Sequence, residues 1–286
     1  MIGPNYTNAP EAQARPNVPK GTVHEFVMDS VESKIYPGLN GPYQRKVWVY
    51  VPAQYKQGTA APLLLVQDGQ HYLKRVTNIL DNLIAERRLP AMVAVFINAG
   101  GGDGKGSERG LEYDTLSERY ANYIEQEVLT RIARDYGIKF TLDPDGRATM
   151  GGSSGGACAL TMGWYRTDFW HRIITFSGTF VDQQSPEDPK TPHGAWEYHE
   201  RLIPQNPRVP LRIWLEVGDH DIGFDREEAS FHNWVMANNR MAAVLKAKGY
   251  HYHYDFAKGA KHVDGNVLGQ TLPGALLWAW DGYRAK

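Results

Sequence analysis

The chain has 286 residues, a formal net charge of −1 at pH 7, 42% hydrophobic residues and a single cysteine, Cys158. This length is enough for one large α/β domain or two small ones. The near-neutral charge excludes long-range attraction to nucleic acid or to an anionic membrane surface. One cysteine excludes an internal disulfide, and no apolar run approaches the roughly 18 residues that a membrane span needs.

The first twenty residues are rich in Pro, Asn and Ala. This composition predicts a flexible or surface-draped arm over residues 1–20. The arm has neither the basic region nor the apolar region of a signal peptide. Localisation stays open between the cytoplasm and an exported form whose signal peptide is missing from this chain.

The next segments read as strands of two kinds. Residues 22–28 and 44–51 alternate apolar and polar side chains, which is typical of antiparallel strands with one solvated face. Residues 62–67 and 92–97 are continuously apolar, which indicates strands buried on both faces. A helix is expected over residues 77–86 between the two buried strands, and a Gly-rich loop over residues 98–106.

Strands and helices continue to alternate to the end of the chain. Helices are expected over residues 115–136, 155–164, 234–248 and 272–283, and strands over 147–152, 171–176, 211–217 and 251–256. This alternation predicts a single doubly wound, mostly parallel sheet with antiparallel N-terminal strands and helices on both faces. The catalytic domain would span residues 21–286. Residues 179–209 are too long for a simple connection, so they are expected to form either a partial cap or a disordered excursion.

The sequence Gly151-Gly-Ser-Ser-Gly-Gly156 lies where a strand should enter a helix. Gly-x-Ser-x-Gly at such a position is how an α/β-hydrolase presents its nucleophile, because small residues are needed on both sides of a very tight turn. The pattern fits both Ser153 and Ser154. We favour Ser153, because the backbone N–H of Ser154 can then face an oxyanion.

A catalytic serine needs a histidine base and a carboxylate that orients it. The strand over residues 211–217 is followed by Gly218-Asp-His-Asp221, and the last strand by a loop that contains His262. We predict Asp221 as the orienting acid, with Asp219 as the reserve, and His262 as the base. His251 and His253 alternate on a strand without a third ligand at useful spacing, so no metal is expected.

The oxyanion of the reaction needs two hydrogen-bond donors. The N–H of Ser154 is the first candidate. The second is the N–H of Gln70, because Asp68-Gly69-Gln70 forms a sharp turn after the first buried strand. A purely structural turn at Asp68-Gly69 is the competing interpretation.

Together these segments resemble the Putative esterase family of α/β-hydrolases, which includes enterochelin, feruloyl and acetylxylan esterases, esterase D and the mycolyltransferases. The resemblance spans nearly the whole chain from about Gly21. It implies Ser153 as nucleophile, His262 as base, Asp221 as orienting acid, and Gln70 with Ser154 as oxyanion hole. It also places Arg109, Glu112 and Tyr113 beside the active site, where bracing of the loop is favoured over substrate contact.

The predicted function is a serine carboxylic-ester hydrolase that acts through an acyl-enzyme and needs no cofactor. The aromatic content of 12% favours an acylated sugar or an aryl (hydroxycinnamoyl) ester. Trp234 and Asn238 lie in a segment that could wall the pocket, although a Trp on a helix is usually core. The alternatives are a ferric-siderophore trilactone esterase, a mycolyl-type acyltransferase and a non-catalytic binding protein. The expected partner is a small-molecule or saccharide ester, without nucleic acid or membrane, and a homodimer is left open.

Overall fold

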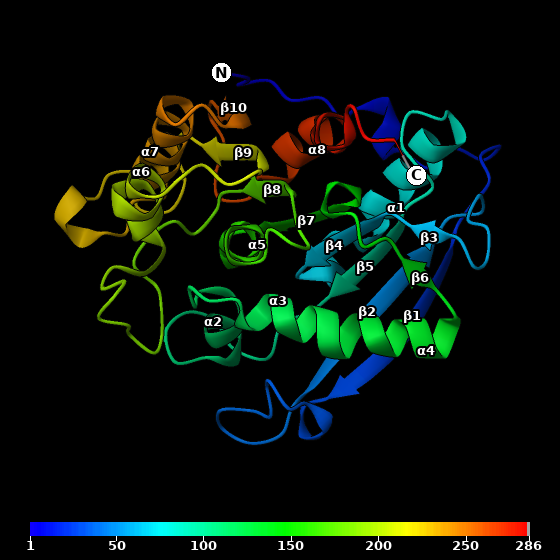
Figure 1. Cartoon of the computed structure of the whole chain (residues 1–286). Coiled ribbons are helices and arrows are strands. Elements are labelled where there is room, and N and C mark those ends of the chain that lie inside the picture. The colour runs from blue at the N-terminus through cyan, green and yellow to red at the C-terminus, as the bar shows by residue number, and fades with distance from the viewer. Residues whose placement is uncertain (285–286) are drawn as a thin grey trace.

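A central sheet of eight strands forms the core of the computed structural model, which describes residues 1–284 (Figure 1). The strand order is β1-β2-β5-β4-β7-β8-β9-β10. β1 pairs antiparallel with β2, and β2 pairs antiparallel with β5. All later pairs in this sheet are parallel. This is the doubly wound sheet with antiparallel N-terminal strands that the sequence predicts.

The strand bounds agree with the sequence pattern to within a few residues. The strands of the main sheet are β1 (Thr22–Asp29), β2 (Gln44–Val51), β4 (Leu63–Gln67), β5 (Val93–Ile97), β7 (Arg147–Gly152), β8 (Arg172–Phe176), β9 (Arg212–Gly218) and β10 (His251–Ala257). A separate pair joins β3 (Ala60–Ala61) to β6 (Lys139–Phe140). Every residue of β4 and β5 is buried, because helices cover both faces of the sheet at these strands.

Helices divide between the two faces of the sheet. α1 (Leu73–Ala85) and α8 (Gly265–Trp280) pack on one face in a single apolar cluster. α2 (Glu108–Tyr113), α3 (Arg119–Tyr123), α4 (Thr130–Tyr136), α5 (Ser154–Tyr165) and α7 (Trp234–Ala247) lie on the other face. α1 shows why such a helix forms: Val76, Ile79, Leu80 and Leu83 recur at helical spacing and are all buried.

Three helices differ from their predicted bounds, and one of them, α1, begins at Leu73, four residues earlier than predicted. The helix expected over residues 115–136 is divided into α3, a π-helical stretch Ile124–Leu129 and α4, and it ends at Gly137 in the left-handed conformation, as predicted. α2 precedes it as a separate helix, begun by Ser107, whose side chain accepts a hydrogen bond from the Gly110 amide. α8 begins at Gly265, seven residues earlier than predicted, because Asp264 caps it. Caps are short-range signals that apolar periodicity does not reveal.

The segment over residues 179–209 is ordered and packs against the sheet. It contains short helical turns at Gly194–Trp196 and Tyr198–Leu202 and the helical segment α6 (Ile203–Gln205). Phe180, Trp196 and Tyr198 are fully buried in the same apolar cluster as α5 and α7. The interpretation as a disordered excursion is therefore wrong, because burial of these large side chains ties the segment to the core, and the interpretation as a partial cap stays a prediction.

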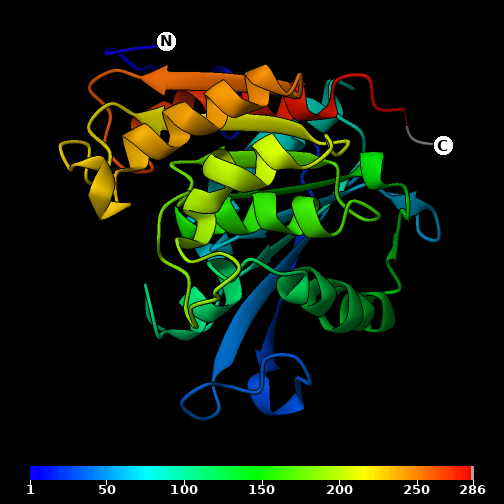
Figure 2. The same ribbon diagram turned by 60° about the vertical axis from the view of Figure 1, so that its left-hand side comes forward.

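The carboxyl ends of the parallel strands meet at one edge of the sheet. The turn after β4, the turn after β7 and the loops after β9 and β10 all lie there, and they carry the candidate catalytic residues. The loop that joins β1 to β2, residues 30–43, projects away from the rest of the sheet (Figure 2). Among residues 1–284, no helix combines the length and apolar character needed to cross a bilayer.

Candidate active site

Ser153 occupies a strained turn between β7 and α5. Its backbone angles are φ 56° and ψ −130°, a region that non-glycine residues rarely adopt. Strain of this kind persists only where the surrounding structure enforces it, and it is concentrated at functional sites. The turn has the strand-turn-helix geometry of the nucleophile elbow of α/β-hydrolases, and we call it the elbow.

Close packing around the turn explains its glycines. A Cβ atom on Gly151 would lie 2.5 Å from the carbonyl carbon and oxygen of Gly155, and one on Gly152 would lie 2.4 Å from Oη of Tyr72. Both distances are far below a normal contact. A side chain at position 151 would therefore require a shift of the backbone, and one at position 152 would require Tyr72 and Val263 to move.

The two serines of the motif have different surroundings. Ser153 lines a large pocket, about 920 Å³ in volume, together with His262. Ser154 is fully buried, and its hydroxyl donates to Oδ2 of Asp114 at 3.2 Å. Only the Ser153 hydroxyl is therefore placed to meet a substrate in that pocket.

His262 and Asp221 form a close polar pair. Nδ1 of His262 lies 2.6 Å from Oδ1 of Asp221, and the Asp221 residue is 1% exposed. The contact assigns the Nδ1 proton to the bond with the carboxylate, so Nε2 is left as the proton acceptor. The Asp219 carboxylate instead lies 2.7 Å from Nδ1 of the adjacent His220. The structure thus brings together the preferred acid and base.

The Ser153 hydroxyl contacts Thr179 in this structure. Its Oγ lies 3.3 Å from Oγ1 of Thr179, which also accepts a hydrogen bond from Nε1 of Trp234. Proton transfer requires the Ser153 side chain to turn from Thr179 toward Nε2 of His262. Catalytic hydrogen bonds that are long or misaligned without substrate commonly tighten when substrate binds.

The two predicted oxyanion donors have different surroundings. Ser154 is the first residue of α5, where the N–H groups have no acceptor within the helix. The backbone N–H of Gln70 donates to Oδ1 of Asn98 at 3.2 Å. In return, Nδ2 of Asn98 donates to Oε1 of Gln70 at 3.1 Å. Stabilisation of an oxyanion by Gln70 requires its contact with Asn98 to yield, so this assignment stays a prediction.

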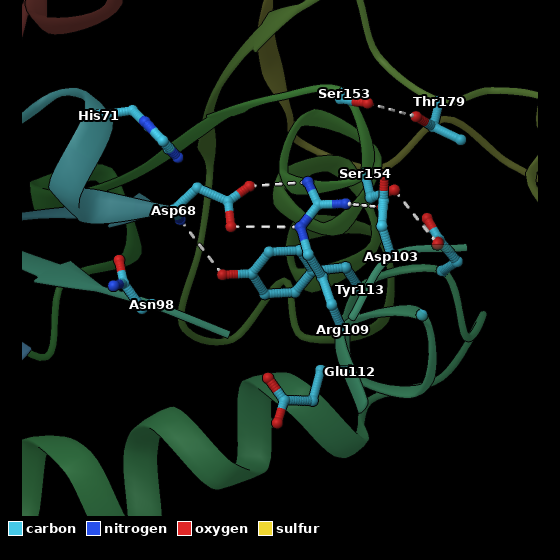
Figure 3. Close-up of polar contacts among 12 residues, drawn as sticks. Asp68, His71, Asn98, Asp103, Arg109, Glu112, Tyr113, Ser153, Ser154 and Thr179 are labelled. Carbon is cyan, nitrogen blue, oxygen red and sulfur yellow. Dashed lines mark hydrogen bonds and ion pairs between the residues drawn. The ribbon is translucent and has the colours of Figure 1, made fainter. Parts of the chain in front are cut away.

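Arg109 is held by two carboxylates at the pocket. Its Nε and Nη2 donate to the two oxygens of Asp68 at 3.2 and 2.7 Å, and Nη1 donates to Asp103 at 2.6 Å (Figure 3). All three residues line the same pocket as Ser153. Sequence reasoning singled out Arg109 but did not identify Asp68 as its partner, because the two lie 41 positions apart.

Glu112 and Tyr113 brace the structure and do not line the pocket. Glu112 points away from Arg109 (Figure 3), is 1% exposed and forms a bidentate pair with Arg45. Oη of Tyr113 accepts a hydrogen bond from the Asp68 amide at 3.2 Å. Arg109 and Glu112 do not pair with each other, because Arg109 is held by Asp68 and Glu112 by Arg45.

Trp234 and Asn238 do not line the pocket either. Asn238 is fully buried on α7, and its side-chain amide donates to the carbonyls of Gly178 and Trp234 at 2.9 Å each. Trp234 is 5% exposed, and its ring stands edge-on to His262 with 6.1 Å between centroids. Substrate contact by Asn238 is therefore contradicted, and Trp234 packs against the ring of His262.

Three more features of this region were missed by the sequence analysis. The buried carboxyl of Asp114 accepts hydrogen bonds from Ser154 and from Nε2 of Gln183, the latter at 3.0 Å, and burial raises its pKa to about 7.

Lys74 and Arg75 line the pocket from α1, and within residues 1–284 neither side chain has an ion-pair partner. The only local signal for the pair is two adjacent basic residues at the start of a helix.

His251 and His253 serve structural contacts. Nδ1 of His251 lies 3.1 Å from Nη1 of Arg212, and the ring of His253 stacks on Trp214. In the part of the chain that the structure describes, no group of three or more His, Cys, Asp or Glu side chains is arranged to hold a metal ion.

Fold and site together define an α/β-hydrolase. The sheet order, the elbow at Ser153 and the pair of Asp221 and His262 at the carboxyl edge of the strands are the features of this class.

The chain belongs to the Putative esterase family, whose model matches residues 42–278. It is 32% identical over 223 residues to the Iron(III) enterobactin esterase of Dickeya dadantii (strain 3937). That match covers 73% of this chain and 46% of the relative, so the chain spans about half the length of the relative.

Solved structures of two kinds share the fold. The enterobactin esterase of Shigella flexneri, determined in the presence of enterobactin, superposes with a TM-score of 0.66 at 20% identity, over 93% of this chain and 60% of the other. A ferulic acid esterase from Anaeromyces mucronatus, in complex with ferulic acid, gives a TM-score of 0.69 at 15% identity and covers 98% of both chains.

Proposed function

We propose that this protein is a serine carboxylic-ester hydrolase in which Ser153 is the nucleophile, His262 the general base and acid, and Asp221 the residue that orients His262. One observation carries the proposal. The strained Ser153 shares a pocket with His262, whose Nδ1 is held 2.6 Å from a buried carboxylate.

The reaction proceeds in two halves. Ser153 Oγ attacks the ester carbonyl carbon while its proton passes to Nε2 of His262, and the carbonyl oxygen becomes an oxyanion next to the Ser154 N–H. Collapse of this intermediate breaks the bond to the alcohol, which leaves with the proton from Nε2. A water molecule then attacks the acyl-enzyme, gives its proton to Nε2, and releases the acid as Ser153 regains its proton.

The charges of the pocket support an anionic aryl ester of the siderophore type. Arg109 is paired with Asp68 and Asp103, whereas Lys74 and Arg75 have no carboxylate partner among residues 1–284, so the lining carries surplus positive charge. The enterobactin esterase of Dickeya dadantii is the relative whose named activity fits this charge.

A hydroxycinnamoyl ester or an acylated sugar is the second candidate, supported by the similarity in fold to a ferulic acid esterase. The aromatic content does not favour it further, because Tyr72 is the sole aromatic residue other than histidine that lines the pocket within the described chain. A mycolyl-type acyltransferase would use the same three catalytic residues and is distinguished by product analysis with an added alcohol. A non-catalytic binding protein would not react with a fluorophosphonate probe.

The test compares the two serines of the elbow. The unmodified protein should be labelled by a fluorophosphonate and should hydrolyse 4-nitrophenyl acetate. Ser153→Ala should lose both properties, whereas Ser154→Ala should keep labelling and substantial turnover. Labelling that survives in Ser153→Ala and is lost in Ser154→Ala would move the nucleophile by one residue. A panel of a catecholate trilactone, methyl ferulate and acetylated xylan then ranks the substrate classes.

A further inference from the structure

The N-terminal arm, residues 1–20, is anchored to the domain along its length. Residue Ile2 forms a parallel bridge with Ala257 of β10, the edge strand of the sheet, through two backbone hydrogen bonds of 3.0 Å. Oη of Tyr6 donates to the carbonyl of Lys258 at 2.6 Å. Of the two alternatives that the sequence leaves open, the structure has the arm that follows the surface.

The arm then crosses from α8 to α1. On the α8 side, the Ala9 amide donates to the Gly269 carbonyl at 2.9 Å. On the α1 side, Nδ2 of Asn82 donates to the carbonyls of Glu11 and Gln13 at 2.8 Å each, and the Glu11 carboxylate pairs with Arg88. The short helical turn Pro10–Ala12 thus bridges the two helices of this face (Figure 1).

Ala12 lies at the middle of this bridge and lines the pocket that contains Ser153 and His262. The same pocket is lined by Lys74, Arg75 and Asn78 from α1 and by Leu268 from α8. The arm therefore contributes to the lining of the pocket between these two helices.

The anchors also connect the arm to the catalytic base. Lys258 begins the loop that carries His262, and it is held by Ile2 and Tyr6 of the arm. At the other end, Asn82 and Arg88 anchor the arm to α1 and the residues that follow it. Because the arm is fixed at both ends, a larger side chain at position 12 cannot be relieved by a simple swing of the arm.

We propose that Ala12 is a specificity-determining residue: the arm is a wall of the substrate pocket, and the small side chain at position 12 sets the size of ester that can enter. The proposal rests on the proposed esterase function. It gives the arm a role in substrate selection that is separate from the chemistry at Ser153.

The test introduces bulk at two positions of the full-length chain. Ala12→Trp fills the pocket wall, and Ala14→Trp is the matched control, since Ala14 is exposed and does not line the pocket. The values of kcat/KM are measured for 4-nitrophenyl acetate, for methyl ferulate, and for the bulkiest ester that the unmodified protein hydrolyses. Thermal unfolding confirms that each variant is folded.

Ala12→Trp should lower kcat/KM for the bulkiest ester about tenfold or more, a size typical of steric discrimination in a pocket. It should lower kcat/KM for 4-nitrophenyl acetate by a smaller factor than for the bulkiest ester, and Ala14→Trp should leave the ratio of the two values unchanged. Asn82→Ala, which removes two anchors of the arm, should shift the preference toward bulky esters instead.

Two results would overturn the role of the arm. One is an unchanged ratio of bulky to small ester turnover in Ala12→Trp, and the other is an equal loss for all esters in a folded variant. Absence of Ser153-dependent hydrolysis of 4-nitrophenyl acetate by the unmodified protein would overturn the proposed function itself. The two failures are therefore distinguishable.

Discussion

Nδ1 of His262 lies 2.6 Å from Oδ1 of Asp221, although 41 positions separate the two residues in the chain. The acid follows β9 and the histidine follows β10, and these strands are parallel neighbours. The pairing of the strands brings the two loops to the same edge of the sheet. The contact between Asp221 and His262 therefore exists only when both loops are in place.

Substitution of the two nearby acids should have unequal effects. Asp221→Asn should lower kcat on the order of 10⁴-fold, because the amide no longer holds His262 in the tautomer that accepts a proton at Nε2. Asp219→Asn should change kcat only slightly, since Asp219 contacts the exposed His220. Steady-state kinetics with 4-nitrophenyl acetate provides the measurement, and greater sensitivity of Asp219 would reassign the orienting acid.

Addition of one methyl group at the elbow should lower both the stability and the turnover of the protein. Gly151→Ala places a Cβ 2.5 Å from the Gly155 backbone, so the free energy of unfolding should fall by about 1–3 kcal/mol or more, and turnover should fall with it. Gly274→Ala is the control: it is exposed on α8 with no atom within 4 Å of the added carbon. It should stabilise the protein by up to about 1 kcal/mol in urea unfolding. Equal effects would contradict the steric explanation of the motif.

Loss of a buried charge should destabilise the fold more than loss of an exposed one. Glu112→Ala leaves the guanidinium of Arg45, a residue that is 3% exposed, without its carboxylate partner, at a cost of about 3–5 kcal/mol. Glu228→Ala removes the exposed partner of Arg240 and should cost less than about 1 kcal/mol. Denaturant unfolding measures both, and similar costs would argue against a bracing role for Glu112.

Lys74 and Arg75 of α1 should favour the binding of negatively charged esters. Lys74→Gln and Arg75→Gln should each raise KM for an anionic ester by about 2- to 10-fold, an effect of solvent-accessible charges that salt should weaken. Neutral 4-nitrophenyl acetate should be unaffected, as should both substrates in Lys56→Gln, whose side chain lies away from this pocket. A KM that rises equally for charged and neutral esters would indicate a packing effect instead.

The buried Asp114 should make stability depend on pH. Burial raises its pKa from 3.8 to about 7, so the folded state holds a proton that the unfolded chain releases. The Asp114 carboxyl therefore contributes to the free energy of unfolding an amount that is fully present below about pH 4. This amount is lost as the pH rises to about 7, at about 1.4 kcal/mol for each pH unit. The carboxyl faces Ser154, Gln183 and Arg109, with Asp103 beyond.

Asp114→Asn should therefore gain stability relative to the unmodified protein as the pH rises from 4 to 7. Glu216, whose pKa burial raises to about 8, contributes the same sign in both proteins and cancels in the difference. Glu187→Gln, an exposed control, should show no such trend. A difference that is constant with pH would show that Asp114 does not titrate in this range.

The strand pattern and the elbow could be predicted from local sequence. Continuous apolar runs identify β4 and β5, and Gly151 is required by its close contact with the backbone of Gly155, four residues further on. The pocket lining could not be predicted in this way. Trp234 and Asn238 are candidates for the wall in the sequence, but α7 turns these side chains toward Thr179 and Gly178.

The sequence by itself determined the order of strands and helices, the turn that holds Ser153, and the candidate acid and base, because these depend on short-range periodicity, sterics and motif spacing. Tertiary structure alone decided that Asp68 pairs with Arg109, that residues 179–209 pack into the core, and that the arm brings Ala12 to the pocket. These relationships join segments far apart in the chain. Their free energy comes from burial and polar contacts that exist only after the sheet has assembled.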